Sequence, residues 1–288
     1  MIEIVAPGPY ATVQDLGRPG YAHLGVPRSG AADAPSLRLA NRLVGNPEGA
    51  AGIELTLGGA RLRFLGGAWA AVTGAPCLIE LVLSGRTTAR GMNAPLWVPE
   101  GGEVRLAAPA RGLRTYVAVR GGLDTPMTLG SRSTDSLCGL GPSPLRAGTV
   151  LPVGPVTGLP ALVVDAAPPP ETPPDVLRVL SGPRDDWFVP GATAALCARP
   201  YLVTPDSNRV GVRLSGTPLR RARARELPSE GMVAGAVQVP PDGQPIVFLA
   251  DHPPTGGYPV IAVVAPACLS VAAQLRPGDR VRFHARPG

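Results

Sequence analysis

The chain has 288 residues, of which 44% are hydrophobic and 17% charged, with a formal net charge of +6. This length and hydrophobic content suffice for one large or two ordinary domains with buried cores. The 37 glycines and 36 prolines are about a quarter of the chain, but a mean hydropathy of +0.15 excludes an intrinsically disordered protein. We therefore expect a compact all-β protein with many tight turns, in which Gly supplies positive φ angles and Pro fixes φ.

All 27 basic residues are arginines, because the chain contains no lysine. The absence of Lys excludes a Walker-type phosphate loop, a Schiff-base mechanism and a Ser-Lys nucleophile pair. It also excludes covalent attachment of biotin to this chain, since the acceptor would be a lysine.

The positive net charge does not by itself indicate a nucleic-acid-binding protein. The arginines are scattered, and the one dense run comprises Arg220, Arg221, Arg223 and Arg225. No aromatic residue is interleaved with them to stack on a base. We therefore expect this run to lie on a solvated strand or loop, and we expect no nucleic-acid partner.

The cysteines and histidines carry no metal or redox motif. Four cysteines lie far apart without a CxxC pair, and the three histidines lack ligand spacing, so no metal site is predicted. The N-terminus has no basic region followed by a long apolar run, and no stretch free of Gly, Pro and charge approaches the length of a membrane span. We expect a reduced, cytoplasmic protein without membrane contacts.

Short strands separated by Gly and Pro turns dominate the chain, which favours barrels or sandwiches and only a few short helices. One helix is predicted over residues 34–44, with Asp33 as its N-cap and Gly45 beyond its end. A second short helix is predicted over residues 267–274. Apolar runs and alternations predict strands at residues 53–58, 61–65, 78–83, 115–119, 212–216, 246–250 and 260–264.

The segment 166–175 carries five prolines and predicts an extended linker between two domains. It divides the chain into a first lobe, residues 1–165, and a second, shorter lobe, residues 176–288. Short motifs recur in the same order in both lobes, which indicates an internal duplication. The pairs are Gly8-Pro9 with Gly182-Pro183, Asn41-Arg42 with Asn208-Arg209, 53–58 with 212–216, Gly91-Met92 with Gly231-Met232, and 145–151 with 275–281.

Polar side chains gather in four glycine-containing regions of the kind that usually binds small ligands. Arginines and hydroxyls in the first two can bind an oxyanion or can merely close turns. Arginines of the third can clamp a carboxylate or pair with surface acids. In the fourth, Asp251 and His252 follow an apolar strand and can act as an acid/base pair. The regions are 12–18 with 27–33, 120–135, 207–213, and 229–258.

No GxSxG or HExxH motif is present, and the residues alone identify no reaction. The polar loops nevertheless contain a set of specific motifs, namely TVQDLGR (12–18), LANRLVGN (39–46), GSRSTD (130–135), SEG (229–231), QVPPDGQP (238–245) and TGGYP (255–259). In these motifs the sequence resembles the family of the 5-oxoprolinase C component, also called allophanate hydrolase subunit 2 or biotin-dependent carboxyltransferase. The resemblance implies two related cyclophilin-like β-barrel lobes, in agreement with the duplication.

This resemblance implies one component of an enzyme that opens 5-oxoproline to glutamate with ATP and Mg²⁺. The nucleotide is expected to bind with or by the partners, namely a tightly bound B-type component, which resembles allophanate hydrolase subunit 1, and an A-type component of the lactam-utilisation type. Within this reading we expect catalytic roles for Asp15 and Glu230, which lie in the matching motifs, and for Asp251, which lies in the fourth polar region. We expect substrate binding by Arg209 of the third polar region and by residues of the motifs, namely Gln14, Arg18, Arg132, Ser133, Asp135, Gln238, Thr255, Gly256 and Tyr258.

The sequence departs from the family pattern at His252-Pro253-Pro254, where members often carry Arg-Gln-Thr, and at Val210, which replaces a frequent Met. The first departure removes an arginine and an amide, so the substrate can differ from that of other members. A biotin-dependent carboxyltransferase component of the urea-carboxylase type is an alternative, with biotin carried by another chain. A non-catalytic regulatory module that binds a kinase-inhibitor-like partner is a second alternative.

Overall fold

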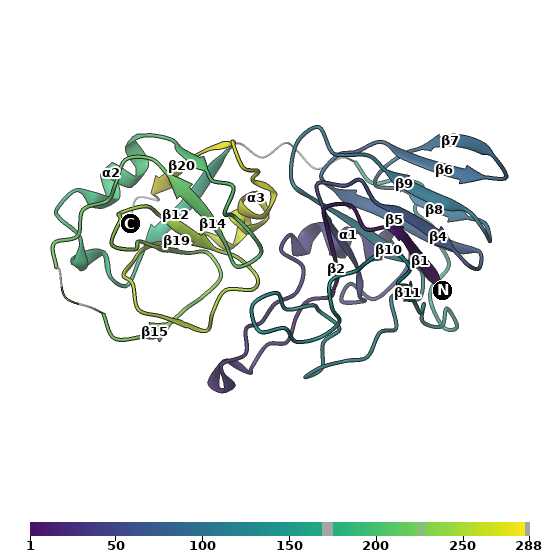
Figure 1. The fold of residues 1–288 in the computed structure, drawn as a ribbon, viewed down its shortest axis with the longest axis horizontal. Coiled ribbons are helices and arrows are strands. Elements are labelled where there is room, and N and C mark those ends of the chain that lie inside the picture. Colours follow the sequence, from purple (N-terminus) through teal and green to yellow (C-terminus); the bar gives the residue numbers. More distant parts are fainter. Residues whose placement is uncertain (169–174, 224, 226, 286–288) are drawn as a thin grey trace. The chain divides into compact units, whose positions relative to one another are not determined.

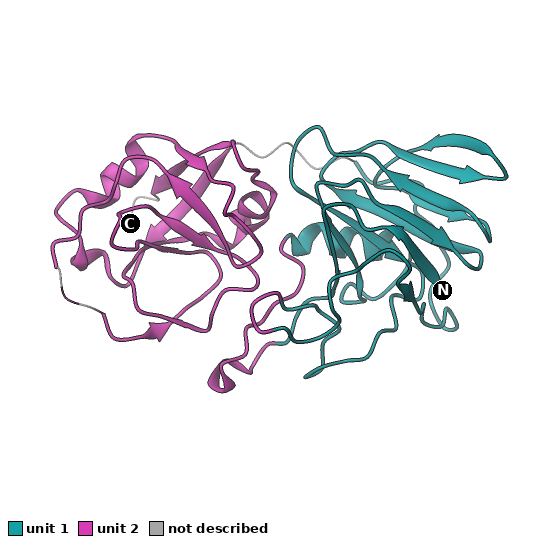
Figure 2. Cartoon of the chain, viewed as in Figure 1, with its two compact units in different colours: residues 1–18, 33–135, 139–171 teal, residues 19–32, 136–138, 172–288 magenta. Residues whose placement is uncertain are grey.

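The computed structural model describes residues 1–168, 175–223, 225 and 227–285. The chain forms two compact units, and two short segments from its first half belong to the second unit (Figure 2). Residues 169–174 of the expected linker lie outside the described residues. Unit 1 comprises Met1–Arg18, Asp33–Asp135 and Gly139–Glu171; unit 2 comprises Pro19–Ala32, Ser136–Cys138 and Thr172–Gly288.

Unit 1 is built from two antiparallel sheets (Figure 1). The larger has the spatial order β11 (Val150–Leu151), β1 (Ile2–Ala6), β4 (Arg61–Phe64), β9 (Glu103–Leu106), β6 (Ile79–Leu83) and β7 (Arg86–Arg90). The smaller has the order β2 (Tyr10–Gln14), β3 (Gly52–Thr56), β10 (Arg114–Val119), β5 (Ala68–Gly74) and β8 (Pro95–Val98).

The burial pattern of the strands follows from their places in the sheets. In β1 the alternate residues Ile2 and Ile4 are fully buried, as expected when one face of a strand packs on a core. In β10, which lies in the middle of the smaller sheet, all six residues are buried. The strand predicted at 53–58 ends at Thr56, because Leu57 and Gly58 adopt left-handed φ angles of 60° and 62°.

The predicted helix after Asp33 is confirmed as α1 (Ala34–Leu43). The Asp33 carboxylate accepts hydrogen bonds from the backbone N–H of Ser36 at 3.2 Å and from its hydroxyl at 2.7 Å. These bonds satisfy N-terminal groups that the helix itself leaves unpaired. Leu37 and Leu43 are buried, and the helix packs on β5 and β10.

A buried polar network ties the start of α1 to the smaller sheet. The Tyr116 hydroxyl donates to Glu54 Oε2 at 2.7 Å and accepts the backbone N–H of Asp33 at 2.8 Å. Glu54 also lies 3.4 Å from the Arg114 guanidinium, and all three side chains are buried. Burial and the nearby carboxylates of Glu54 and Asp33 raise the pKa of Tyr116 well above its ordinary value, so its hydroxyl stays protonated and able to donate.

Unit 2 is a closed barrel, in which β12 also pairs in parallel with the last strand. The predicted all-β fold with a few short helices and barrel architecture is thereby confirmed. A separate two-stranded sheet pairs β15 (Glu230–Gly231) with β18 (Thr255–Gly256). The barrel order is β12 (Val176–Ser181), β19 (Val260–Val264), β16 (Ala236–Gln238), β17 (Ile246–Phe248), β14 (Gly211–Ser215), β13 (Tyr201–Val203) and β20 (Arg280–Ala285).

The short helices of unit 2 are only partly predicted by the sequence. The expected helix at 267–274 is present as a 3₁₀ turn, η3 (Pro266–Cys268), followed by α3 (Leu269–Gln274). The pattern did not predict α2 (Ala192–Ala198), which follows the left-handed Gly191, or two further 3₁₀ turns. These turns are η1 (Ala22–Leu24) and η2 (Asp185–Trp187).

The repeated motifs do not all have the same local structure. The predicted strands 53–58 and 212–216 correspond to β3 and β14, and the segments at 145–151 and 275–281 each lead into a strand. Asn41 and Arg42, by contrast, lie in α1, whereas Asn208 and Arg209 lie in the loop before β14. This motif pair therefore does not mark an equivalent element in the two units.

Replacing Tyr116 by Phe should destabilise the protein, because Glu54 loses a donor and the buried N–H of Asp33 loses its acceptor. We expect a loss of about 1–3 kcal/mol in the free energy of unfolding, measured by urea denaturation. Tyr21→Phe is the control, since no hydrogen bond joins the Tyr21 hydroxyl to any described residue. Equal stabilities of the two variants would show that the network does not anchor α1.

Candidate functional site

The structure divides the predicted site residues into three clusters, one in unit 1 and two in unit 2. The Asp15 cluster contains Gln14, Asp15, Arg18, Arg132, Ser133 and Asp135. The Asp251 cluster contains Arg209 and Asp251, and the Tyr258 cluster contains Glu230, Gln238, Thr255, Gly256 and Tyr258.

In the Asp15 cluster, one buried carboxylate organises the loop that follows residue 128. Asp15 comes directly after β2, and its Oδ1 accepts the hydroxyls of Ser131 and Ser133, each at 2.6 Å. Its other oxygen accepts the backbone N–H of Arg132 at 2.6 Å, and the N–H of Gly17 donates to Oδ1 at 2.7 Å. Charge-assisted hydrogen bonds of this length are strong, so the carboxylate fixes the loop conformation.

Arg18 and Gln14 form hydrogen bonds to the same loop, and both side chains are fully buried. The Arg18 guanidinium donates to the carbonyl oxygens of Thr128 and Ser133. Gln14 donates to the carbonyl oxygen of Thr134 at 3.0 Å. Within the described residues, Arg18 Nη1 and Gln14 Oε1 have no hydrogen-bond partner. Both residues therefore act mainly as supports of the loop, each with one polar atom left over.

Arg132 is the residue of this cluster best placed to meet a ligand. Its backbone is held by Asp15, while its side chain is 23% exposed and lies 2.5 Å from the exposed Asp124 carboxylate. An ion pair with an exposed partner contributes little and is readily exchanged. Asp135, by contrast, is buried and its backbone N–H donates to the carbonyl oxygen of Leu140.

The Asp251 cluster is centred on a fully buried ion pair. Arg209 donates through Nε and Nη2 to the two carboxylate oxygens of Asp251 at 2.9 and 3.0 Å. The side chains of Arg209 and Asp251 are 3% and 0% exposed. Ser136 adds its backbone N–H at 3.0 Å and its hydroxyl at 2.6 Å to the same carboxylate, and Arg209 Nη2 reaches the carbonyl oxygen of Gly30 at 2.6 Å.

The Arg209–Asp251 ion pair forms hydrogen bonds with both segments from the first half of the chain that belong to unit 2. Gly30 belongs to the segment 19–32 and Ser136 to the segment 136–138. The backbone N–H of Ser29 also donates to the carbonyl oxygen of Ala250, next to Asp251. The pair therefore attaches these two loops to the barrel.

Burial opposes ionisation of Asp251, but the charge of Arg209 and the hydrogen bonds from Arg209 and Ser136 outweigh it and lower the pKa of the carboxyl group. Asp251 is thus ionised at neutral pH, with both oxygens occupied. The predicted acid/base pair with His252 is not formed, because His252 Nδ1 lies 2.9 Å from the carbonyl oxygen of Pro253 instead. The Asp251 carboxylate therefore positions Arg209 and Ser136 through hydrogen bonds.

The Tyr258 cluster surrounds the two-stranded sheet. Glu230 and Gly256 are directly opposite each other in β15 and β18, and the Glu230 carboxylate is held by Nε and Nη2 of Arg184. Gln238 donates to the carbonyl oxygen of Tyr258 at 3.0 Å. A Cβ at Gly256 would lie 2.7 Å from the Gln238 side-chain amide, so a larger residue there would displace that amide.

The arginine run, which sequence reasoning assigned to a solvated strand or loop, is an irregular loop whose side chains lie on aromatic rings. Arg221 lies 5.4 Å from the centroid of Tyr258, and Arg223 and Arg225 lie 5.5 and 5.3 Å from that of Trp187. Arg225 is exposed, as predicted, but Arg221 is half-buried. Sequence inspection missed these contacts because the rings come from other parts of the chain.

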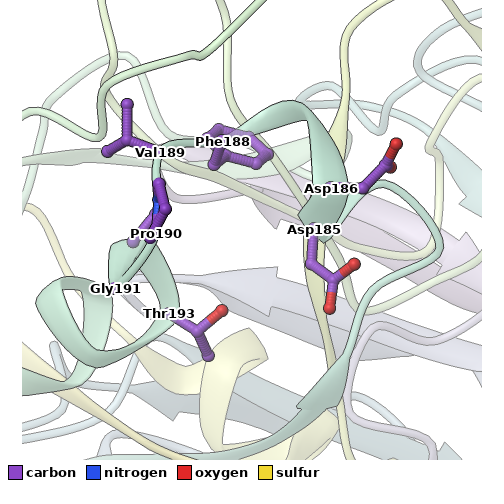
Figure 3. A pocket seen from close by; sticks show the side chains of 8 residues that line it. Asp185, Asp186, Phe188, Val189, Pro190, Gly191 and Thr193 are labelled. Atoms are coloured by element: carbon purple, nitrogen blue, oxygen red, sulfur yellow. The ribbon is translucent and has the colours of Figure 1, made fainter.

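A hollow at the start of α2 is lined by none of the predicted site residues (Figure 3). The Asp185 carboxylate accepts the Ser181 hydroxyl, and the Asp186 carboxylate forms an ion pair with Arg223. The lining residues are Asp185, Asp186, Phe188, Val189, Pro190, Gly191, Ala192 and Thr193.

Three further properties concern only the part of the chain that the structure describes. No group of three or more His, Cys, Asp or Glu side chains there could hold a metal ion. The four cysteines are free thiols. No helix among these residues combines the length and the apolar character that crossing a membrane requires.

The fold of this chain is shared with a known class of proteins. Residues 24–285 match the family described as carboxyltransferase domain, subdomain A and B, and the chain belongs to this family. The chain is 38% identical to the C component of the 5-oxoprolinase of Escherichia coli K12 over 293 residues, which covers 98% of this chain and 90% of that protein. It is 35% identical to the urea amidolyase of Lachancea kluyveri over 313 residues, which covers 98% of this chain and 17% of that protein.

Solved structures of other proteins are similar to this chain over nearly its whole length. The crystal structure of TTHA0988 superimposes with a TM-score of 0.86 at 38% identity and covers 98% of this chain and 55% of that one. The Kluyveromyces lactis urea carboxylase gives a TM-score of 0.89 at 33% identity, with 98% of this chain and 27% of that one covered. This chain therefore corresponds to about half or less of these larger proteins.

Replacing Asp251 by Asn should leave the buried Arg209 guanidinium without its counter-charge. We expect a loss of about 3–5 kcal/mol in the free energy of unfolding, measured by chemical denaturation. Asp206→Asn removes an exposed carboxylate and should change stability by less than about 0.5 kcal/mol. Comparable small losses in both variants would refute the role of the ion pair in stability.

The contribution of Asp251 to the free energy of unfolding should also depend on pH. Because the folded pKa of Asp251 lies below its ordinary value, the ion pair stabilises the protein fully above a pH of about 4. The contribution should be lost as the pH falls through the lowered pKa. The stability difference between the wild type and Asp251→Asn, measured from pH 7 to pH 2, should therefore narrow on the acid side. A constant difference would contradict this assignment.

Proposed function

We propose that this chain is the C component of an ATP-dependent 5-oxoprolinase, which opens 5-oxoproline to glutamate together with A-type and B-type components. One observation carries the proposal: identity of 38% to the C component of the E. coli 5-oxoprolinase extends over 98% of this chain and 90% of that protein. A second 5-oxoprolinase C component, from Haemophilus influenzae, is 34% identical over 99% of the chain.

The polar clusters suit the opening of a lactam. Attack on the ring carbonyl builds negative charge on its oxygen, which a guanidinium and nearby N–H or hydroxyl groups stabilise best when they are already in place. Arg132 combines a partly exposed guanidinium with a backbone held by Asp15. In this proposal the carboxylates of Asp15, Glu230 and Asp251 are occupied by hydrogen-bond partners and position their neighbours, and the substrate binds to the arginines.

ATP with Mg²⁺ supplies the phosphoryl transfer that activates the lactam oxygen in this reaction. This chain has no lysine and no Walker-type phosphate loop. We therefore place the nucleotide with or on the partner proteins and derive no phosphoryl step from this chain.

A biotin-dependent carboxyltransferase is the second candidate. The description of the matching family and the similarity to urea amidolyases favour it. Because the chain has no lysine, the biotin carrier would have to be another chain. This candidate predicts transfer of CO₂ from a carboxybiotin carrier protein, and no glutamate from 5-oxoproline.

The proposal is tested by supplying 5-oxoproline and ATP to this chain, co-purified with its B-type partner and mixed with the A-type component. Release of ADP and glutamate in equal amounts, lost on omission of any component, is the expected result. Tight binding of the B-type partner without turnover would favour the regulatory alternative. Carboxyl transfer without glutamate release would favour the second candidate.

Arg132→Ala should lower the kcat of that assembly by about 100-fold to 1000-fold, the usual effect of losing one group that stabilises a developing oxyanion. Arg146→Ala, which removes an exposed arginine outside the three clusters, should leave kcat unchanged. Steady-state glutamate release measures both. Wild-type turnover in Arg132→Ala would remove Arg132 from the site.

A further inference from the structure

We propose that Arg221, stacked on Tyr258, forms an anion-binding subsite that takes the carboxylate of a small organic acid. Arg221 is not among the site residues expected from the sequence motifs. The subsite deepens the proposed function and rests on it for the choice of substrate, because 5-oxoproline carries a ring carboxylate.

The backbone holds Arg221 in place although the loop is irregular. Arg221 and Phe188 form an isolated antiparallel bridge. On either side, Val189 donates to the carbonyl oxygen of Arg220, and Ala222 donates to that of Trp187. The loop is therefore fixed against the start of unit 2 before any ligand arrives.

The side chain of Arg221 has only part of its hydrogen-bonding capacity in use. Its Nη2 donates to the carbonyl oxygen of Val239, and its guanidinium lies 5.4 Å from the ring centroid of Tyr258. Its Nε is buried without a hydrogen-bond partner among the described residues and is not open to a ligand. A guanidinium presents five N–H donors in a planar fork that matches a carboxylate, and Nη1 has no hydrogen-bond partner among the described residues. The Nη1 donors are therefore left for a ligand.

No ion pair joins Arg221 to a carboxylate within the described residues, whereas Arg184 pairs with Glu230 and Arg223 with Asp186. Its neighbours Arg220 and Arg225 have no described ion pair either, but they are exposed, and Arg221 is half-buried. Burial lowers the pKa of Arg221, against the opposing influence of Tyr258 and Asp242. A half-buried cation that is not held in an ion pair gains more from an anionic ligand than a solvated one does.

Tyr258, the aromatic side of the subsite, is 44% exposed and held in place. Gln238 holds the carbonyl oxygen of Tyr258 and packs against Gly256, so the segment between Thr255 and Tyr258 cannot move freely. Such a pre-formed site loses little conformational entropy on binding. The ligand class is a small carboxylic acid that lies against the tyrosine edge.

The test uses the assembled enzyme and two substrates, 5-oxoproline and its uncharged carboxamide. Arg221→Gln should raise the KM for 5-oxoproline by about 10-fold to 100-fold, the effect of losing a charge-assisted hydrogen bond, with kcat little changed. Its KM for the carboxamide should not change. Arg221→Lys, which keeps the charge, should recover part of the loss, and Arg220→Gln, at an exposed neighbour, should behave as the wild type.

An unchanged KM for 5-oxoproline, or equal increases for the acid and the carboxamide, would overturn the subsite. Ligand-observed NMR of 5-oxoproline with the same assembly separates this failure from failure of the proposed function. Binding that Arg221→Gln abolishes, in an assembly without turnover, would support the subsite and contradict the proposed reaction. Binding that persists in Arg221→Gln, or no binding to the wild type, would overturn the subsite.

Discussion

Each unit contains a buried carboxylate that holds part of the irregular segment from Thr128 to Ser136, Asp15 in unit 1 and Asp251 in unit 2. Asp15 accepts the hydroxyls of Ser131 and Ser133 and the backbone N–H of Arg132. Asp251 accepts the backbone N–H and the hydroxyl of Ser136. A segment without strand or helix must satisfy its polar groups in another way, and an ionised acceptor does so with short, strong hydrogen bonds.

The same constraint separates the residues that organise the site from those that can meet a ligand. The oxygens of Asp15 and Asp251 are occupied by neighbouring donors, and Glu230 is held by Arg184. Arginines with weaker or incomplete pairing, Arg132 and Arg221, keep part of their donors for a ligand. The resulting chemistry is recognition of anions and stabilisation of negative charge, in keeping with the small acids that the proposed reaction uses and produces.

Much of the scaffold could be predicted from the sequence because it is encoded locally. Asp33 followed by an amphipathic stretch defines α1, and apolar runs define strands such as β10 and β19. The barrel of unit 2 and the all-β class follow from short strands and Gly-rich turns. The end of β3 at Thr56 was not predicted, because the left-handed φ of Leu57 has no sequence signal.

The site could be predicted only as a set of loops. Adjacent residues such as Asp251 and His252 suggested an acid/base pair, whereas the actual partners of Asp251 lie 42 and 115 positions away. The stacking of Arg221 on Tyr258 and the assignment of 19–32 and 136–138 to unit 2 are likewise long-range contacts. Such pairs join residues that are far apart in the sequence, and they become visible only in the complete fold. Residue types could therefore identify the candidate residues but not the residues that they contact.

Hydrogen exchange of the backbone amides in the intact wild-type protein tests most directly whether the two carboxylates hold this segment. The amides of Arg132 and Ser136 should exchange on the order of 100-fold more slowly than in an unstructured peptide. Gly130, whose amide has no hydrogen-bond acceptor among the described residues, should exchange rapidly. Exchange of all three amides at the rate of an unstructured peptide would contradict the account.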